Sequence, residues 1–246
     1  MKKLSLSVIS LTLIFLLNTS NLKSQELQFG LDFQIGAPQN DFNTQMDSRL
    51  GFGVGGMFGY RFDNTPFMLG LDFGFMNFGT ETREEPLSST IPDLRVEVEN
   101  SYNLFHGDVL LRVLSPERAA RPYIEGLFGF NHFFTQTVLR ERGGFGSEPD
   151  KLRDTNFRDT ALSYGFGAGL QFRVFSDDGT RSEQNENEFS GPYSVYIHLA
   201  SRYMFGREAE YLREGSIIRE GGNVTYDVVQ STTDLLHFKI GITVGF

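Results

Sequence analysis

Apolar and polar residues alternate along much of the chain. In residues 26–36, Leu27 and Phe29 stand at odd positions, and Gln28 and Gly30 stand at even ones. Successive side chains of a β-strand point to opposite faces, so a period of two predicts strands with one apolar and one polar face. The pattern predicts eight strands, at residues 26–36, 50–62, 67–76, 96–113, 123–138, 162–174, 195–202 and 236–246.

Two of these stretches interrupt the alternation. Val98 and Tyr102 fall on the opposite parity from Phe105 and Val109, and a β-bulge near Leu104 would reconcile the two sets. Residues 123–138 carry aromatic side chains on both parities. There we expect one set of residues to face outward, Ile124, Phe128, Phe130 and Phe134, and another to face inward, Glu125 and Asn131.

The chemistry of the two faces favours a barrel in a membrane. A soluble barrel needs a charged exterior, but the face opposite the apolar one is mostly glycine with isolated Asp, Arg and Gln. A membrane barrel places its apolar face against lipid and satisfies its backbone hydrogen bonds between strands. The sequence therefore predicts an all-β fold, a closed antiparallel transmembrane β-barrel of about eight strands with a polar, plugged interior. A soluble sandwich or lipocalin-like barrel is the alternative.

The lengths of the connections support an even number of strands. With the amino terminus in the periplasm, residues 37–49, 79–95, 139–159 and 206–233 would form long outer loops, and residues 63–66 and 115–122 would form short turns. Residues 176–192 break this rule because they form a long polar segment on the short-turn side. We expect that segment to be an exposed periplasmic tether.

The start of the chain has the features of an export signal. Lys2 and Lys3 precede an apolar run, residues 4–17, which is too short to span a bilayer as a helix but has the length of a signal-peptide core. We expect cleavage near Ser24, which leaves a signal peptide, residues 1–24, and one barrel domain, residues 25–246. The absence of Cys excludes a disulfide framework and thiolate chemistry.

Removal of the signal peptide makes the chain more acidic. Lys2, Lys3 and Lys23 would leave with it, so the formal net charge changes from −9 to −12. Nonspecific binding to a phosphate backbone needs clustered Lys and Arg. We therefore expect no nucleic acid among the partners.

The histidines lack the spacing that ester chemistry on a strand face would require. Acyl transfer or ester hydrolysis needs a nucleophilic Ser, a His base and an acidic group close together. The residues two positions after the four histidines are Asp108, Phe134, Ala200 and Lys239, and none is Ser. Residues 177–179 lack the closing Glu of a calcium loop, and the GGFG at residues 143–146 lacks the Lys of a phosphate loop. We expect no catalytic, metal-binding or cofactor-binding residues, and we expect His106 and His198 to be interior polar groups.

Charged residues of both signs occupy the face that should point into the barrel. By parity the inward acidic and basic residues are Asp32, Asp72, Asp108 and Glu125, and Arg61, Arg112, Arg173, Arg202 and Lys239. Unpaired charges in a narrow lumen are strongly unfavourable, so a ladder of hydrogen-bonded ion pairs that plugs the barrel is expected. Arg112 and Arg173 should lie near the periplasmic mouth and bind Asp32 or Asp72.

Three segments resemble a known group of proteins. The last strand, which ends at Phe246, resembles the signal by which the outer-membrane assembly machinery recognises its substrates. SYGFGAGLQFRV, residues 163–174, resembles a strand of the OmpA-like or PorT-like barrels of Bacteroidota, and YMFGREAEYLREGSI, residues 203–217, resembles a loop of that group. The resemblance covers the mature chain and implies a multi-pass barrel in the outer membrane of a Gram-negative bacterium, with Phe246 as the assembly signal. It implies no activity.

The function expected from these observations is non-enzymatic. We expect an outer-membrane barrel that contacts outer-membrane lipid and the assembly machinery, and whose loops or tethers bind an envelope protein. Such a barrel would serve as an accessory subunit of a larger envelope complex or as a surface interaction module. The alternatives are a small porin-like channel and a lipid-modifying enzyme.

Overall fold

The computed structural model describes most of the chain after residue 25. The described residues are 26–63, 65–88, 91–116, 119–141, 151–177, 192–213, 215–220 and 223–246. The expected signal peptide, residues 1–24, lies outside the described residues, and so does most of the expected tether, residues 176–192.

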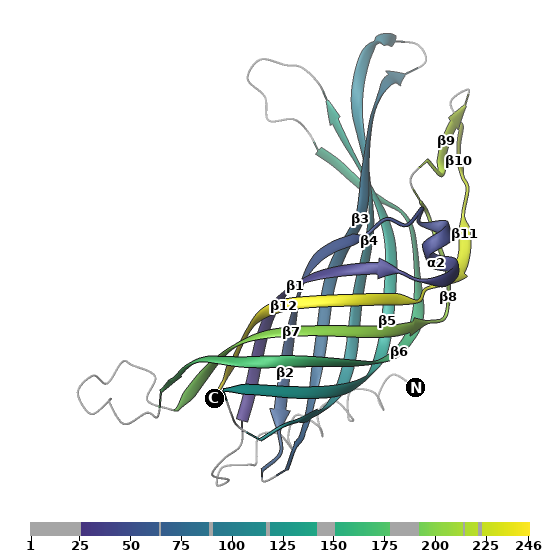
Figure 1. Cartoon of the computed structure of the whole chain (residues 1–246). Coiled ribbons are helices and arrows are strands. Elements are labelled where there is room, and N and C mark those ends of the chain that lie inside the picture. The colour runs from purple at the N-terminus through teal and green to yellow at the C-terminus, as the bar shows by residue number, and fades with distance from the viewer. Residues whose placement is uncertain are drawn as a thin grey trace, which may run out of the picture.

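Eight antiparallel strands close into a barrel in the order β1-β12-β7-β6-β5-β4-β3-β2 (Figure 1). The strands are β1 (Glu26–Pro38), β2 (Gly51–Arg61), β3 (Phe67–Ser88), β4 (Ile91–Leu114), β5 (Ala120–Glu141), β6 (Lys151–Asp177), β7 (Tyr193–Gly206) and β12 (Leu235–Gly245). Pairing of β1 with β12, from Gln28↔Gly245 to Pro38↔Leu235, closes the sheet on itself. This confirms the fold class predicted from the alternation.

The remaining elements lie at one end of the barrel. They are α2 (Asn40–Gln45), the pair β8 (Glu208–Tyr211) and β11 (Val229–Thr232), and the pair β9 (Ile217–Glu220) and β10 (Asn223–Tyr226). In Figure 1 they lie at the end opposite the carboxyl terminus, which we call the loop end. Within the described part of the chain, no helix has the length and apolar character needed to cross a membrane.

Four neighbouring strands are about twice as long as the other four. β3, β4, β5 and β6 contain 22, 24, 22 and 27 residues, whereas β1, β2, β7 and β12 contain 13, 11, 14 and 11. A tilted strand of about 9–11 residues spans a bilayer. The long strands therefore extend well beyond the barrel wall, as Figure 1 shows. We call this extension, which begins after Asn77 of β3 and ends before Ser163 of β6, the loop-end sheet.

The expectation of long outer loops at residues 79–95 and 139–159 is wrong, because most of these residues belong to strands of the loop-end sheet. β3 pairs with β4 as far as Ser88↔Ile91, and β5 pairs with β6 as far as Arg140↔Lys151. Residues such as Glu81, Thr82 and Arg83 are polar on both faces, so the period of two disappears from the sequence. The strands continue because backbone hydrogen bonds do not require an apolar face.

The barrel turns its apolar face outward. Leu31, Val54, Ile124, Phe128 and Phe166 all expose more than half of their surface. The next residues along each strand point inward and are buried or partly buried. This arrangement is the one required by a surrounding layer of lipid.

β4 keeps one parity throughout its described side chains, so the expected β-bulge near Leu104 is wrong. Val98, Tyr102 and Leu104 are buried inside, and pairing between β4 and β5 runs without a register shift. The irregularity lies on the neighbouring strand, between Asn77 and Gly79 of β3. The apolar residues of β4 face inward because the interior itself becomes apolar toward the loop end.

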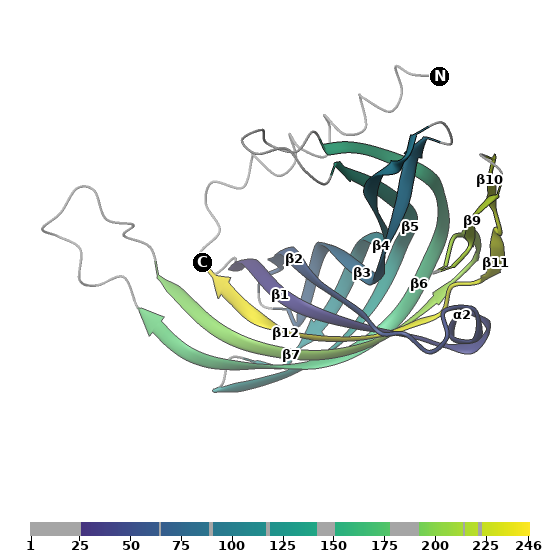
Figure 2. The same ribbon diagram turned by 90° about the horizontal axis from the view of Figure 1, so that it is seen from above.

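That apolar region forms a cap inside the loop end of the barrel. Phe42 of α2 is fully buried, and its ring lies 5.7 Å from Phe78, 5.6 Å from Phe133 and 5.4 Å from Tyr211. The cap consists of Phe42, Met46, Met76, Phe78, Leu104, Phe133, Ala161, Ala209, Tyr211 and Leu235. Seen from above, α2, β9, β10 and β11 lie together on the side away from the carboxyl terminus (Figure 2).

Two glycines on β5 provide a test of how tightly the interior is packed. A Cβ on inward-facing Gly129 would overlap the carbonyl oxygen of Gly107 and lie 2.7 Å from Cα of Asp108, whereas a Cβ on Gly126 would have no heavy atom within 4 Å. We expect Gly129→Ala to destabilise the barrel by about 1–3 kcal/mol, because backbone must shift to accommodate it. The temperature at which the fast-migrating band converts to the slow one on SDS gels measures this.

Gly126→Ala is the matched control, because it makes the same change on the same strand. We expect it to leave the conversion temperature unchanged. Equal conversion temperatures for both variants and the parent would contradict a closely packed interior.

Candidate functional site

The interior of the barrel contains a continuous chain of charged side chains with alternating sign. Arg202 of β7 is its junction, since its Nε donates to Oε1 of Glu125 at 2.6 Å and its Nη1 donates to Oδ1 of Asp72 at 2.8 Å. The full order of the chain is Arg112, Glu125, Arg202, Asp72, Lys239 and Asp32, and all six are buried. We call it the ion-pair chain.

Both ends of the ion-pair chain are held by close contacts. Nε and Nη2 of Arg112 lie 2.9 and 2.8 Å from Oε2 of Glu125, directly across the β4–β5 pair. Nζ of Lys239 lies 2.8 and 2.9 Å from the two oxygens of Asp72 and 3.4 Å from Oδ2 of Asp32. Each carboxylate of the ion-pair chain, Asp32, Asp72 and Glu125, therefore has at least one cationic neighbour, as buried charges require.

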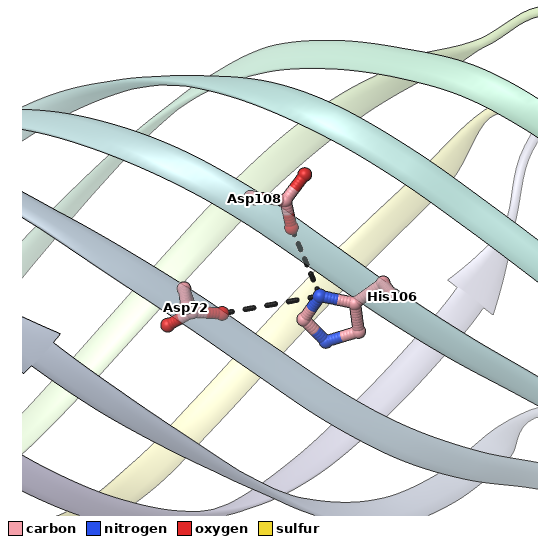
Figure 3. A group of neighbouring side chains, drawn as sticks. All are labelled: Asp72, His106 and Asp108. Carbon is pink, nitrogen blue, oxygen red and sulfur yellow. Dashed lines mark hydrogen bonds and ion pairs between the residues drawn. The ribbon is translucent and has the colours of Figure 1, made fainter. Parts of the chain in front are cut away.

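A branch of hydrogen bonds joins the ion-pair chain to His106 of β4. Nε2 of Gln34 donates to Asp32 at 2.7 Å, and Oε1 of Gln34 lies 2.9 Å from Nε2 of His106. The other ring nitrogen, Nδ1, lies 2.9 Å from Oδ2 of Asp108 and 3.9 Å from Oδ1 of Asp72 (Figure 3). The close-up shows the two aspartates approaching the same edge of the imidazole from neighbouring strands.

Most of the charges expected inside lie inside, and they include Asp32, Asp72, Asp108, Arg112, Glu125, Arg202 and Lys239. Arg61 lies apart from them at the short-turn end, with Nη1 3.0 Å from Oε2 of Glu26. Arg121 joins that group through Glu26 at 3.3 Å and the hydroxyl of Tyr196 at 3.0 Å. Parity places Arg121 inward, but sequence reasoning missed it because it stands at the start of a strand.

Arg173 is the exception among the expected interior charges. It is exposed, and no ion pair joins it to any described residue. The pairing of β6 with β7 shifts register between Arg173 and Phe175, and residues 172–176 are all exposed. Parity fails there because the end of β6 projects past the barrel wall, so no lumen faces either side.

The expected partners of Arg112 also need correction. Arg112 pairs with Glu125, and Asp72 pairs with Arg202 and Lys239. A directly opposite residue on the adjacent strand lies closer than any residue across the lumen. The pairing of Arg112 with Glu125 could have been found by aligning the two strands through their turn, which the parity argument alone does not do.

Among the described residues, neither His198 nor His132 belongs to an exposed group of nucleophile, base and acid. His198 lies 3.0 Å from Oγ1 of Thr243 and 3.9 Å from Oδ2 of Asp32, which resembles the order of nucleophile, base and acid. Thr243 is buried in the lumen, so its hydroxyl is not exposed at the surface. On the outside, His132 bonds Thr160 at 2.7 Å, and no described acidic side chain holds the other ring nitrogen.

Arg202→Ala tests whether the ion-pair chain stabilises the barrel. Its removal takes one partner from Asp72 and one from Glu125 while both remain buried. We expect a loss of about 3 kcal/mol, at the lower end of the range for a broken buried pair, because each acid keeps one cation. The temperature of gel-band conversion is the measurement.

Arg173→Ala is the matched control, since it removes the same side chain from an exposed position. We expect a change within about 0.5 kcal/mol. If the two variants convert at the same temperature, the interior charges do not stabilise the barrel.

Several solved structures of outer-membrane proteins have some likeness to this chain. Neisserial surface protein A has 11% identity and a TM-score of 0.42, covering 91% of this chain and 98% of that one. Ail of Yersinia pestis, in complex with the heparin analogue sucrose octasulfate, has 14% identity and a TM-score of 0.41, covering 91% and 100%. A major outer membrane protein from Thermus thermophilus has 11% identity and a TM-score of 0.39, covering 89% and 99%.

The family match is more extensive. A search of curated protein sequences found no match. Residues 9–230, which are most of the chain, match the family described as outer membrane protein beta-barrel domain. The closed eight-stranded barrel with its apolar exterior agrees with that match, and the chain belongs to the outer membrane protein β-barrel domain family.

Proposed function

We propose that this protein is a closed, non-enzymatic outer-membrane barrel that presents the loop-end sheet to a protein partner of the cell envelope. One observation carries the proposal: the lumen is filled. The ion-pair chain occupies its middle, and the apolar cap covers it toward the loop end. A barrel filled in this way has its structured surface at its ends.

The order of inward-facing residues along individual strands supports the proposal that the lumen is closed. In β3 the inward residue Asp72 is followed toward the loop end by Met76 and Phe78, and in β12 Lys239 is followed by His237 and Leu235. Met76, Phe78 and Leu235 belong to the apolar cap. An ion would have to displace both a bonded charge layer and an apolar layer to pass.

The loop-end sheet is held in place by the segment that carries β8 to β11. Oε2 of Glu81 accepts from the hydroxyl of Tyr102 and from the backbone of Gly215, both at 3.2 Å. Nη1 of Arg83 donates to the carbonyl of Ile217 at 3.0 Å. Ile217 also packs with Tyr102 in a small buried apolar cluster. These contacts order the sheet before any partner binds, which reduces the entropy lost on binding.

An edge of the loop-end sheet suits a partner that adds a strand. β3 pairs with β2 only as far as Asn77, but with β4 as far as Ser88. Beyond Gly79, β3 is thus an edge strand of the sheet. An extended peptide that pairs with such an edge gains main-chain hydrogen bonds and reads alternate side chains.

Location and assembly complete the proposal. Outer-membrane location follows from the family and fold. We further propose that residues 1–24 are removed on export, that the loop end faces outward, and that Phe246 is read by the assembly machinery. Phe246 exchanges backbone hydrogen bonds of 3.1 and 2.9 Å with Leu27, so it belongs to the seam that closes the barrel. We also propose that the chain is one of the OmpA-like or PorT-like barrels of Bacteroidota.

Conductance in planar lipid bilayers tests closure. We expect the parent protein to insert without current steps, because paired charges and the apolar cap block the lumen. Phe42→Ala together with Arg202→Ala should produce leakage, since it opens both layers. Regular current steps from the parent would favour the small porin-like channel instead. Changed lipid A masses in cells that express the parent would favour the lipid-modifying enzyme.

Site-specific photocrosslinking in the native outer membrane tests partner binding. A photoreactive side chain at exposed Thr82, on the edge strand, should give one reproducible protein adduct. The control is the same group at Phe128, which lies on the lipid-facing side of the barrel and is 60% exposed. The same adduct from both positions, or none from Thr82, would contradict a partner at the loop-end sheet.

A further inference from the structure

The outward residues of β7 change character toward the loop end. Ile197 and Leu199 are apolar and exposed, and Tyr203 and Phe205 follow them on the same face. Arg207, directly after the strand, is exposed. Aromatic rings concentrate where the hydrocarbon of a bilayer meets its headgroups. Arg207 therefore lies at the level of the lipid headgroups.

A groove of about 610 Å³ opens at this boundary. The rings of Tyr164 and Phe205 form its apolar side and stack with their centroids 5.4 Å apart. Its polar side is lined by Arg207, Glu208 and Asp234. Because Tyr164 faces outward and is 56% exposed, the groove lies on the outside of the barrel. It combines aromatic rings, a guanidinium group and carboxylates of two residues.

The charged groups of the groove differ in their contacts. Oδ1 of Asp234 accepts from the backbone N–H of Gly206 at 3.1 Å, and Oδ2 accepts from the side-chain amide of Asn40 at 2.7 Å. These bonds hold the carboxylate at the edge of the groove. Among the described residues, neither the guanidinium of Arg207 nor the carboxylate of Glu208 has a hydrogen-bond or ion-pair partner. Both groups are therefore available to a ligand.

We propose that this groove binds the headgroup of an ethanolamine phospholipid, with the phosphate at Arg207 and the ammonium between Glu208 and Asp234. A guanidinium donates several N–H bonds to phosphate oxygens, and a primary ammonium donates to carboxylates. Only a short ethylene chain separates the phosphate from the ammonium, which suits charges on consecutive residues. The glycerol and the upper acyl chains then lie against Tyr164 and Phe205.

The balance of charge selects this headgroup over the other common ones. Phosphatidylglycerol would bring its phosphate beside the two carboxylates without any positive charge to compensate them. A choline headgroup has the right charges, but its quaternary nitrogen has no N–H to donate. The inference does not depend on the protein partner proposed above, because none of the groove residues belongs to the loop-end sheet.

Native mass spectrometry of lipid binding tests the proposal. The protein is extracted from outer membranes in detergent, delipidated, and mixed with phosphatidylethanolamine or phosphatidylcholine of identical acyl chains. We expect phosphatidylethanolamine to bind about threefold more tightly, a modest factor because the charges are exposed. Glu208→Gln should reduce or remove this preference. Arg207→Gln should weaken the binding of both lipids, since both carry the phosphate.

Glu210→Gln and Arg158→Gln are the matched controls, because both side chains are exposed and lie outside the groove. Both variants should bind the two lipids like the parent. Gel-band conversion verifies that each variant forms a closed barrel, as expected for changes at exposed positions. Equal affinity of the parent for the two lipids, or tighter binding of phosphatidylglycerol, would overturn the proposal. So would the same loss of preference in Glu210→Gln and Glu208→Gln.

Discussion

The bond between Arg202 and its two carboxylates is the interaction on which the interior depends. Lipid outside the barrel requires an apolar exterior, and the period of two then turns most polar residues of the barrel wall inward. Asp72 and Glu125 come from β3 and β5, and Arg202 of β7 reaches both across the lumen. Three of the eight strands are therefore joined by contacts that their backbone pairing does not provide.

The ion-pair chain also explains why the interior changes character along its length. Charges that are fully paired need little water, so the lumen can continue directly into the apolar cap around Phe42. The same eight strands would leave room for a narrow wet passage if their inward residues were small and neutral. Here large side chains such as Arg112, Arg202 and Lys239 fill that room.

The fold could be predicted from the sequence because the membrane and the closed barrel both determine which positions of a strand are apolar and which are polar. Both therefore lead to the same alternation of odd and even positions. Leu31, Phe128 and Ile240 face outward as their alternation indicates. Parity also placed Asp72 and Glu125 inward. It does not give the stagger between strands, so it could not identify Arg202 as the partner of both acids.

Parity fails where its physical cause is absent. At Arg173 the strand has left the barrel wall. In residues 79–84 the side chains of both faces are polar, so no apolar set of positions marks the outside. His237 shows the opposite limit: its inward position follows from parity, but its closeness to His106 depends on strands far apart in sequence.

The strands of the barrel differ in length, so one part of the sheet spans the membrane and another part extends beyond it. β1, β2, β7 and β12 are close to the length that spans a bilayer, whereas β3 to β6 continue beyond it. A free sheet of that size would be marginal in water, because its strands are polar and lack a broad apolar face. Two supports replace the missing core: covalent continuity with strands fixed in the barrel, and the contacts of Glu81 and Arg83 with the β8–β11 segment. Those contacts cover one side of the loop-end sheet, so the edge of β3 beyond Gly79 is where added strand pairing stabilises it most.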